Sequence, residues 1–301
     1  MRVGISIGTT FNPGDSADAP NSVLAQANAA ARAGLDSLTV GDHHSTAPNV
    51  YLQNVPVIGR VLAVWDQRPV GCLFLVPLWH PVLMAEQIGT LAAMAAAPFI
   101  IQVGAGAGQA QFGAMGKDLR ERGARTERGI RLVKALLDGE TVDDEEWNIK
   151  GAHIAPLPVK ETEWWIGGSV QRSIDRAARL GTCWYGNADL TIQSAAEAID
   201  LYREACAHHD LRPTRIPIRK DVFIDEDRVE AERVGNSLVD GGYRGFERGA
   251  VAYGDPQSVA EQLAPFGELG FTDIIIRTMS VPPDAAVRSV ELVAEVRARL
   301  Q

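Results

Sequence analysis

Polar side chains directly follow two apolar runs of the sequence, at Asp42-His43-His44 and at Trp79. Such a cluster can supply a general acid or base, a hydrogen-bond donor to a substrate, or half of a metal site. His43 is therefore the candidate catalytic residue, and Asp42, His44 and Trp79 are candidates for contact with a substrate. The alternatives are a capped turn with one buried, hydrogen-bonded histidine and, for Trp79, ordinary packing.

Two glycine-rich segments also follow apolar runs, Gly104-Ala105-Gly106 and Gly167-Gly168-Ser169. Glycine lets a backbone approach a planar ligand closely, and free N–H groups at the start of a helix bind phosphate. These six residues are candidate cofactor contacts. The alternatives are a flexible loop at the first segment and a plain tight turn, with Ser169 as helix N-cap, at the second.

A metal site is not expected. The segment Gly8-Thr9-Thr10 lacks the histidine pair that many metal-dependent barrels carry after their first strand, and no HExxH motif occurs. Cys72, Cys183 and Cys206 lie far apart, which argues against a disulfide framework or a structural zinc site. A metal-dependent hydrolase built around Asp42, His43 and His44 remains a less favoured alternative.

The candidate segments need elements that bring them together, and the hydrophobic pattern supplies eight short strands that alternate with amphipathic helices. The predicted strands are 2–8, 37–40, 70–76, 99–103, 164–166, 183–185, 216–224 and 274–277. In about 300 residues this pattern favours a single (β/α)8 TIM-barrel domain over 1–301. The competing doubly wound sheet would carry GxGxxG after its first strand, and this sequence does not.

Two segments interrupt the alternation. The range 138–158 predicts an inserted surface hairpin, and the Gly- and Arg-rich range 240–254 predicts a mobile loop near the barrel mouth. Substrate specificity is expected in 9–18, 45–54 and 240–254. Arg244, Arg248 and Arg277 are possible partners for an anionic tail, with a solvated surface charge as the alternative for each.

The balance of charge limits the partners. With 29 basic and 38 acidic residues the formal net charge is −9, which disfavours binding to nucleic acid or to an anionic membrane. The longest uncharged apolar run is interrupted by Pro98 and is too short to span a bilayer. A cytoplasmic setting is expected.

Several motifs together resemble the bacterial-luciferase-like family of flavin-dependent oxidoreductases. They include ARAGLDSLTVGDHH at 31–44, VPLWHPVLMAEQ at 76–87 and WIGGSVQRSIDRAARLG at 165–181. The resemblance implies a barrel with a flavin at its C-terminal mouth, faced by His43. Cys72–Leu73 falls where family members often carry a non-prolyl cis peptide bulge behind the flavin ring, and Gly167-Gly168-Ser169 matches the phosphate-binding turn of the family. At Ala105 the sequence departs from luciferase, which has a phosphate-binding arginine near this position.

The resemblance implies two activities. The first is a monooxygenase that uses reduced FMN, delivered by a partner flavin reductase, and oxygen on a small organic substrate. The second is hydride transfer with coenzyme F420, and the Asp42-His43 pair resembles this branch. A non-catalytic flavin-binding barrel is a third reading. Family members are commonly homodimers, so a homodimer is expected.

Overall fold

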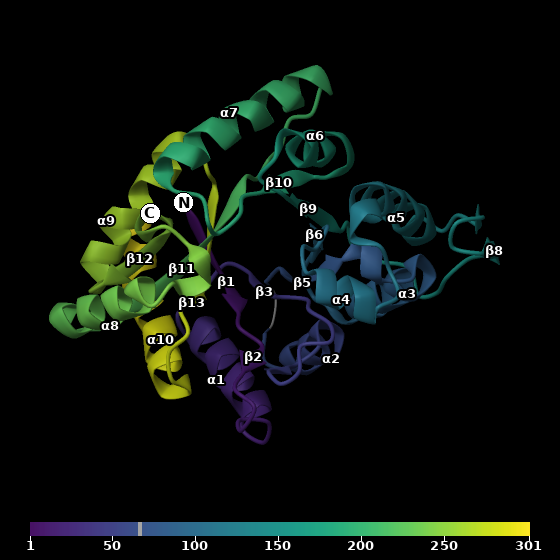
Figure 1. Ribbon diagram of the computed structural model, residues 1–301. Coiled ribbons are helices and arrows are strands. Elements are labelled where there is room, and N and C mark those ends of the chain that lie inside the picture. The colour runs from purple at the N-terminus through teal and green to yellow at the C-terminus, as the bar shows by residue number, and fades with distance from the viewer. Residues whose placement is uncertain (66–67) are drawn as a thin grey trace.

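The computed structural model describes residues 1–65 and 68–301, and its central feature is a closed barrel of eight parallel strands (Figure 1). Seven direct pairings place the strands side by side, with β1 between β3 and β13. A bridge between Gly186 and Ile218 joins β10 to β11 and closes the ring. In barrel order the strands are β1 (Arg2–Ile7), β3 (Leu38–Val40), β5 (Val70–Leu75), β6 (Phe99–Gly104), β9 (Glu163–Gly167), β10 (Cys183–Tyr185), β11 (Pro217–Ile224) and β13 (Asp273–Thr278). The predicted (β/α)8 architecture is confirmed.

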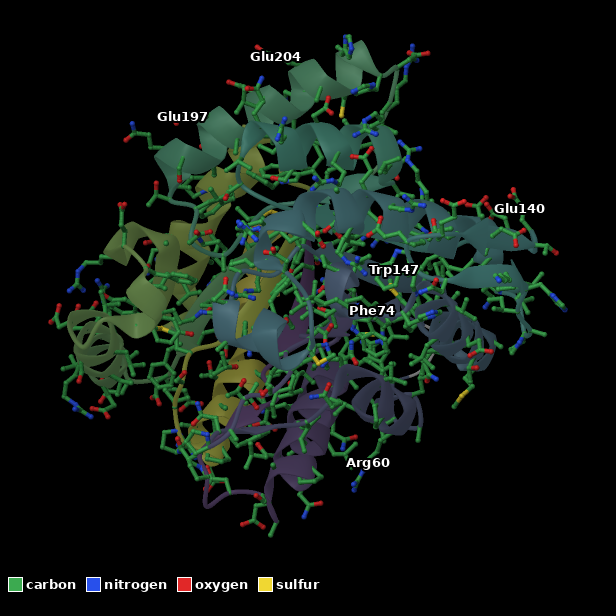
Figure 2. All side chains as sticks on the ribbon, turned by 45° about the vertical axis from the view of Figure 1, so that its right-hand side comes forward. Arg60, Phe74, Glu140, Trp147, Glu197 and Glu204 are labelled. Atoms are coloured by element: carbon green, nitrogen blue, oxygen red, sulfur yellow. The ribbon has the colours of Figure 1, made fainter. Side chains whose placement is uncertain are left out.

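Helices surround the barrel, and the outward side chains of the strands form a continuous apolar core with them. The longer helices are α1 (Ala19–Arg32), α2 (Asn54–Val61), α3 (Pro81–Met94), α5 (Arg122–Leu137), α6 (Gln171–Leu180), α7 (Ile192–His208), α8 (Arg228–Asp240), α9 (Pro256–Leu269) and α10 (Pro283–Leu300). Figure 2 shows Phe74 inside the molecule and Glu197 and Glu204 on the outer side of α7. The charged faces of the helices therefore meet solvent, as amphipathic sequences require. Among the described residues, no helix has both the length and the apolar character needed to cross a bilayer.

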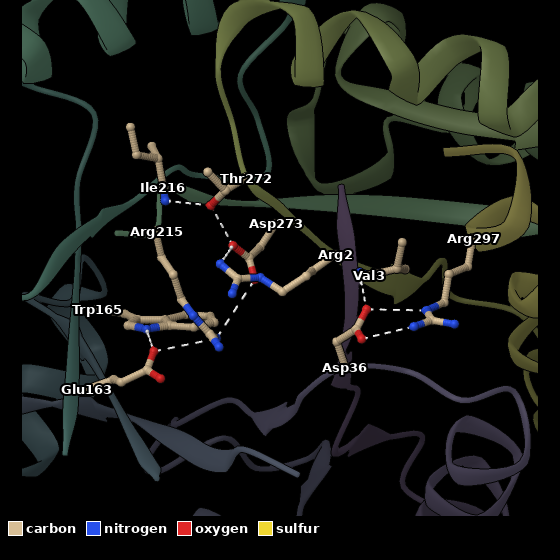
Figure 3. Close-up of polar contacts among 10 residues, drawn as sticks. All are labelled: Arg2, Val3, Asp36, Glu163, Trp165, Arg215, Ile216, Thr272, Asp273 and Arg297. Carbon is tan, nitrogen blue, oxygen red and sulfur yellow. Dashed lines mark hydrogen bonds and ion pairs between the residues drawn. The ribbon is translucent and has the colours of Figure 1, made fainter. Parts of the chain in front are cut away.

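Ion pairs close the N-terminal end of the barrel (Figure 3). Arg2 Nε lies 2.8 Å from Asp273 Oδ1, and Arg215 lies 3.5 Å from Glu163. Trp165 donates its indole N–H to Glu163 at 2.9 Å and fills the barrel above this network, with no exposed surface. Because this end is packed and charge-paired, the opposite end, where the strands terminate, is the place for a ligand.

Two small antiparallel sheets and a ninth strand beside the barrel complete the fold. The predicted hairpin in 138–158 is confirmed as β7 (Val142–Asp144) paired antiparallel with β8 (Ile149–Ala152). A second small sheet, β2 (Thr10–Phe11) with β4 (Val50–Tyr51), lies at the barrel mouth and was not predicted.

The prediction of a mobile loop over 240–254 is wrong for its last four residues. These form β12 (Val251–Gly254), a ninth strand that pairs in parallel with the C-terminal half of β11, from Asp221 to Ile224. Position 254 has a φ of +144°, which glycine tolerates and which ends the strand before α9. The strand was missed because its apolar residues are few and the flanking glycines and arginines dominate the composition.

Candidate active site

His43 stands on the segment that leaves β3 at the barrel mouth. Its ring is open to solvent and lies edge-on to Tyr51, with ring centroids 5.3 Å apart. Surrounding protein atoms still desolvate the ring in part, and this lowers the pKa of His43 below its ordinary value of 6.5. Asp42 opposes the shift, and Arg277 adds to it. The neutral imidazole is therefore favoured at pH 7.

Asp42, His44 and Trp79 form one group behind His43. Asp42 is fully buried, and its Oδ2 accepts hydrogen bonds from the backbone N–H of Leu75 at 2.7 Å and from the indole of Trp79 at 2.8 Å. His44 Nε2 lies 3.3 Å from Asp42 Oδ1. A buried carboxylate needs such donors, and in return it fixes the ends of β3 and β5 relative to each other.

The structure thus brings the three predicted substrate contacts together, but their positions differ. Asp42 has no exposed surface, whereas His44 and Trp79 are half-buried. The backbone N–H of His44 donates to Gln111 Oε1 at 2.7 Å. Gln111 belongs to the short helix α4 (Gln109–Ala114), and sequence reasoning missed it because a single glutamine carries no distinctive pattern.

Gly104 and Gly106 lie against an apolar cluster formed by Leu73, Leu75 and Phe112. A Cβ atom at Gly104 would lie 3.3 Å from Leu73 Cδ1. A Cβ at Gly106, where φ is +71°, would lie 2.9 Å from the Phe112 ring. Ala105 stands between them and is half-buried. The segment is therefore a close-packed surface almost free of side chains, with apolar residues beneath it.

The expectation for Cys72–Leu73 is wrong in one respect. Among residues 1–65 and 68–301, the cis peptide bonds are Ala47–Pro48 and Ala155–Pro156, so Cys72–Leu73 is trans. Both residues pair regularly with β6, which leaves no bulge at this point. Cys72 is fully buried in the outer core, and burial raises the pKa of its thiol, whereas the Leu73 side chain is half-buried beside Gly104.

The turn Gly167-Gly168-Ser169 connects β9 to α6. Gly168 has a φ of +151°, and a Cβ there would lie 2.1 Å from Ser173 Oγ, so glycine is required. The carbonyl of Gly168 accepts the indole N–H of Trp184 at 2.8 Å. Ser169 is exposed and is not the helix cap; the N-cap is Val170, whose N–H donates to Ser173 Oγ at 3.2 Å.

Arginines gather around the starts of α5 and α6, next to the glycine segments. Arg122 donates to the carbonyl of Gly106 at 3.1 Å. Arg176 donates to the carbonyl of Gly123 at 3.4 Å, and its pKa is lowered by burial and, to a smaller extent, by Arg179 and Arg172. Arg122 thus brings a cation to the loop where Ala105 supplies none. Sequence reasoning missed it because the arginine comes from a helix that starts 16 positions later in the chain.

A second charged group lies at the ends of β11 and β13. Asp221 accepts hydrogen bonds from Arg219 at 3.0 Å, from the hydroxyl of Tyr243 at 2.9 Å and from Arg244 at 3.3 Å. Arg277 lies beside this group, and burial lowers its pKa. The alternative of a solvated surface charge is therefore wrong for Arg277, whereas it fits Arg248, which is half exposed and paired with Asp240.

Buried polar atoms without a hydrogen-bond partner concentrate at the mouth. In the described part of the chain nine side-chain atoms have this property, and six belong to residues at or just beyond strand ends. These six are Thr9 Oγ1, Asp42 Oδ1, His44 Nε2, Tyr51 OH, Tyr185 OH and Thr278 Oγ1, of which Asp42 Oδ1 and His44 Nε2 lie 3.3 Å from each other without hydrogen-bond geometry. Buried polar groups are nearly always satisfied in folded proteins, so this concentration indicates a place built to hold a polar ligand.

The described side chains do not form a set of metal ligands. Over residues 1–65 and 68–301, no three His, Cys, Asp or Glu side chains come together as ligands for an ion. The hydrolase alternative therefore lacks a ligand set within these residues.

The chain resembles proteins of known activity. The sequence matches the family described as luciferase-like monooxygenase over residues 1–252. An FMNH2-dependent dimethylsulfone monooxygenase of Pseudomonas fluorescens is 24% identical over 221 residues, or 72% of this chain and 59% of the relative. The chain thus spans less than two thirds of that relative. An F420-dependent glucose-6-phosphate dehydrogenase of Beutenbergia cavernae is 26% identical over 305 residues, or 85% of this chain and 87% of the relative.

Solved structures agree on the fold. The monooxygenase RslO1 from Streptomyces bottropensis is 18% identical and aligns with a TM-score of 0.84 over 98% of both chains. At this identity the likeness establishes the barrel and not the reaction. The family match over residues 1–252 covers most of the chain. The chain therefore belongs to the luciferase-like monooxygenase family.

Proposed function

We propose that this protein is a monooxygenase that uses reduced FMN and oxygen on a small organic substrate. The observation that carries the proposal is the barrel mouth, where buried polar groups, a histidine with a lowered pKa and a glycine-rich segment all lie at the ends of the strands. The FMNH2 dependence of the relative from Pseudomonas fluorescens supports this choice of cofactor.

The residues at the mouth fit a flavin. Gly104 and Gly106 carry no side chains, so a planar ring could approach their backbone closely, and Leu73 would add apolar contact beside them. The N–H groups at the start of α6, after Gly167-Gly168-Ser169, suit a phosphate, and Arg122 would add positive charge nearby. When bound, reduced FMN would supply the electrons that activate oxygen.

We assign His43 to proton transfer with the substrate. Its neutral ring can accept or release one proton at a ring nitrogen, and its exposure leaves it accessible to a bound molecule. Asp42 would act as a positioning residue, because it is buried and its carboxylate is already engaged by protein donors. Trp79 and His44 would line the pocket and shield it from water.

The test is equilibrium binding of FMN and of coenzyme F420 to the purified protein, followed by fluorescence. Micromolar binding of FMN, followed by oxygen consumption with reduced FMN and candidate substrates, is the expected result. Binding of neither cofactor would refute the proposal.

Hydride transfer with coenzyme F420 is the second candidate. The relative from Beutenbergia cavernae matches this chain over a larger share of both lengths than the dimethylsulfone monooxygenase does. Preferential binding of F420, with turnover under anaerobic conditions, would establish this function instead. A non-catalytic flavin-binding barrel would bind cofactor without turnover in either assay.

We further propose a single-domain homodimer in the cytoplasm, with a flavin reductase as partner. The three free cysteines are buried, which suits a reducing compartment. An apolar groove between α1 and α2, lined in part by Val23, Leu24 and Val57, supports self-association. Sedimentation velocity tests the dimer, and oxygen uptake with and without an added reductase tests the partner.

A further inference from the structure

We propose that the substrate carries an anionic group of carboxylate size, and that Arg277 binds this group on the β13 side of the mouth. This inference rests on the proposed function, because it names the chemical class of the substrate for the same site. The environment of this one arginine carries the inference.

Arg277 has no anionic partner among the residues that the structure describes. Its register neighbour on β11 is Asp221, but the carboxylate of Asp221 already accepts hydrogen bonds from three other residues. One oxygen accepts from Arg219, and the other accepts from the hydroxyl of Tyr243 and from Arg244. No other carboxylate of residues 1–65 and 68–301 lies within 4.0 Å of the Arg277 guanidinium.

The group therefore has an excess of positive charge. Arg219, Arg244 and Arg277 contribute three positive charges and Asp221 one negative charge, which leaves a net charge of +2 at the ends of β11 and β13. A partly buried cation without a partner is unfavourable, because its lost hydration is not replaced. A bound anion would supply the missing partner.

The guanidinium of Arg277 lies across the ends of β1 and β3. A Cβ at Gly8 would lie 3.4 Å from Nη2, and a Cβ at Gly41 would lie 4.0 Å from Nη1. Both positions are glycine, so no side chain covers the guanidinium there. Arginine binds a carboxylate through two parallel N–H donors, and an uncovered guanidinium edge suits this geometry.

Buried hydroxyl groups lie near the same place. Thr278 follows Arg277 in the chain, Thr9 follows β1, and Tyr51 lies beside Gly41, with its oxygen 2.8 Å from a Cβ built there. The hydroxyl oxygens of these three residues are buried; those of Thr9 and Tyr51 lie close to each other, and that of Thr278 has no hydrogen-bond partner in the described part of the chain. An anion held by Arg277 can accept hydrogen bonds from such hydroxyls, and the hydroxyls would then donate to it.

The position also separates this anion from the cofactor phosphate. Around the barrel, β13 and β9 are separated by β11 and β10 on one side and by β1, β3, β5 and β6 on the other. The phosphate turn follows β9, so the two anions would occupy different sides of the mouth. Arg277 is close enough to His43 to lower its pKa, so a substrate anchored at Arg277 would present its remainder beside the histidine.

The experiment compares benzoate with benzamide, which has the same shape and no charge. Binding of each to the purified wild-type protein is measured by calorimetry, without cofactor and with saturating FMN. We expect benzoate to bind at least about tenfold more tightly than benzamide, and FMN to leave its binding intact. Equal binding of the two would overturn the proposal. Displacement of benzoate by FMN would also overturn it, because Arg277 would then serve the cofactor.

Variants locate the effect. Arg277→Gln should abolish the preference for benzoate, and Arg277→Lys should retain part of it. Arg233→Gln is the matched control, since Arg233 is exposed on α8 and paired with Glu230 at 2.6 Å. If Arg277→Gln fails to fold, the wild-type comparison of the two compounds still decides. Benzoate binding that depends on Arg277, in a protein that binds neither FMN nor F420, would support the anion site and reject the proposed function.

Discussion

Replacement of Lys220 by methionine should weaken the pH dependence of stability on the alkaline side of neutrality. Lys220 lies on β11 between Arg219 and Asp221 and points outward, because side chains alternate along a strand. It is 1% exposed, and its Nζ donates to the carbonyls of Leu190 at 2.6 Å and Ala188 at 3.3 Å. Burial lowers the pKa of Lys220 from 10.5 to about 8.

The magnitude follows from this difference. One pKa unit corresponds to about 1.4 kcal/mol, so the fall from 10.5 to about 8 opposes folding by about 3 kcal/mol at neutral pH. Between these two values the unfolded chain binds more protons than the folded protein does. The free energy of unfolding therefore rises with pH in this window, by about 2 kcal/mol between about pH 7.5 and 9.5.

The assay is urea unfolding at about pH 7.5, 8.5 and 9.5 on wild type and on Lys220→Met, with Lys150→Met as the control. Lys150 is exposed on β8, so its variant should keep the wild-type slope. Lys220→Met should lose about 2 kcal/mol of the rise. It also leaves the carbonyls of Ala188 and Leu190 without this donor, but that loss does not depend on pH. Equal slopes for wild type and Lys220→Met would refute the reasoning.

Three further predictions concern the mouth. The activity with reduced FMN should fall as the pH drops below 6.5, because His43 then gains a proton, and His43→Asn should be slower and lack this part of the kcat/KM profile. Gly168→Ala should weaken FMN binding at least about tenfold in a fluorescence titration, because its Cβ would overlap Ser173 in the first turn of α6. Gly59→Ala should not weaken FMN binding, because a Cβ built at Gly59 has no neighbouring atom within 4 Å. Equal losses in the two variants would contradict the assignment of the phosphate-binding turn. Trp79→Phe removes a donor to the buried Asp42 and should lower the free energy of unfolding by about 1–3 kcal/mol in urea, and an unchanged value would contradict the role of this hydrogen bond.

The strands were predictable where burial on both faces makes them apolar throughout. Val70–Leu75 and Phe99–Gly104 are of this kind, and their ends were placed to within one residue. β12 was not predictable, because a four-residue strand on the edge of β11 depends on its pairing partner more than on its own sequence.

The candidate site was also predictable only in part. His43 and the glycine segments were placed at the mouth because they directly follow strands. Arg277 was recognised as a charge, but its burial could not be read from a sequence in which arginine is usually exposed. The inward direction of Arg219 and Asp221 depends on the register of β11 in the closed barrel, and so do the hydrogen bonds that the Asp221 carboxylate accepts.

The pairing of β1 with β13 has a consequence for biosynthesis. Arg2 and Asp273 bond across 271 positions, so the barrel cannot close until almost the entire chain has left the ribosome. Before that moment β1 and β10 are the free edges of an incomplete sheet, and unpaired strand edges attract other chains. Contacts between such distant residues also make folding slow. Production of this protein in cells should therefore respond to temperature and to chaperone supply more strongly than the number of its buried residues would suggest.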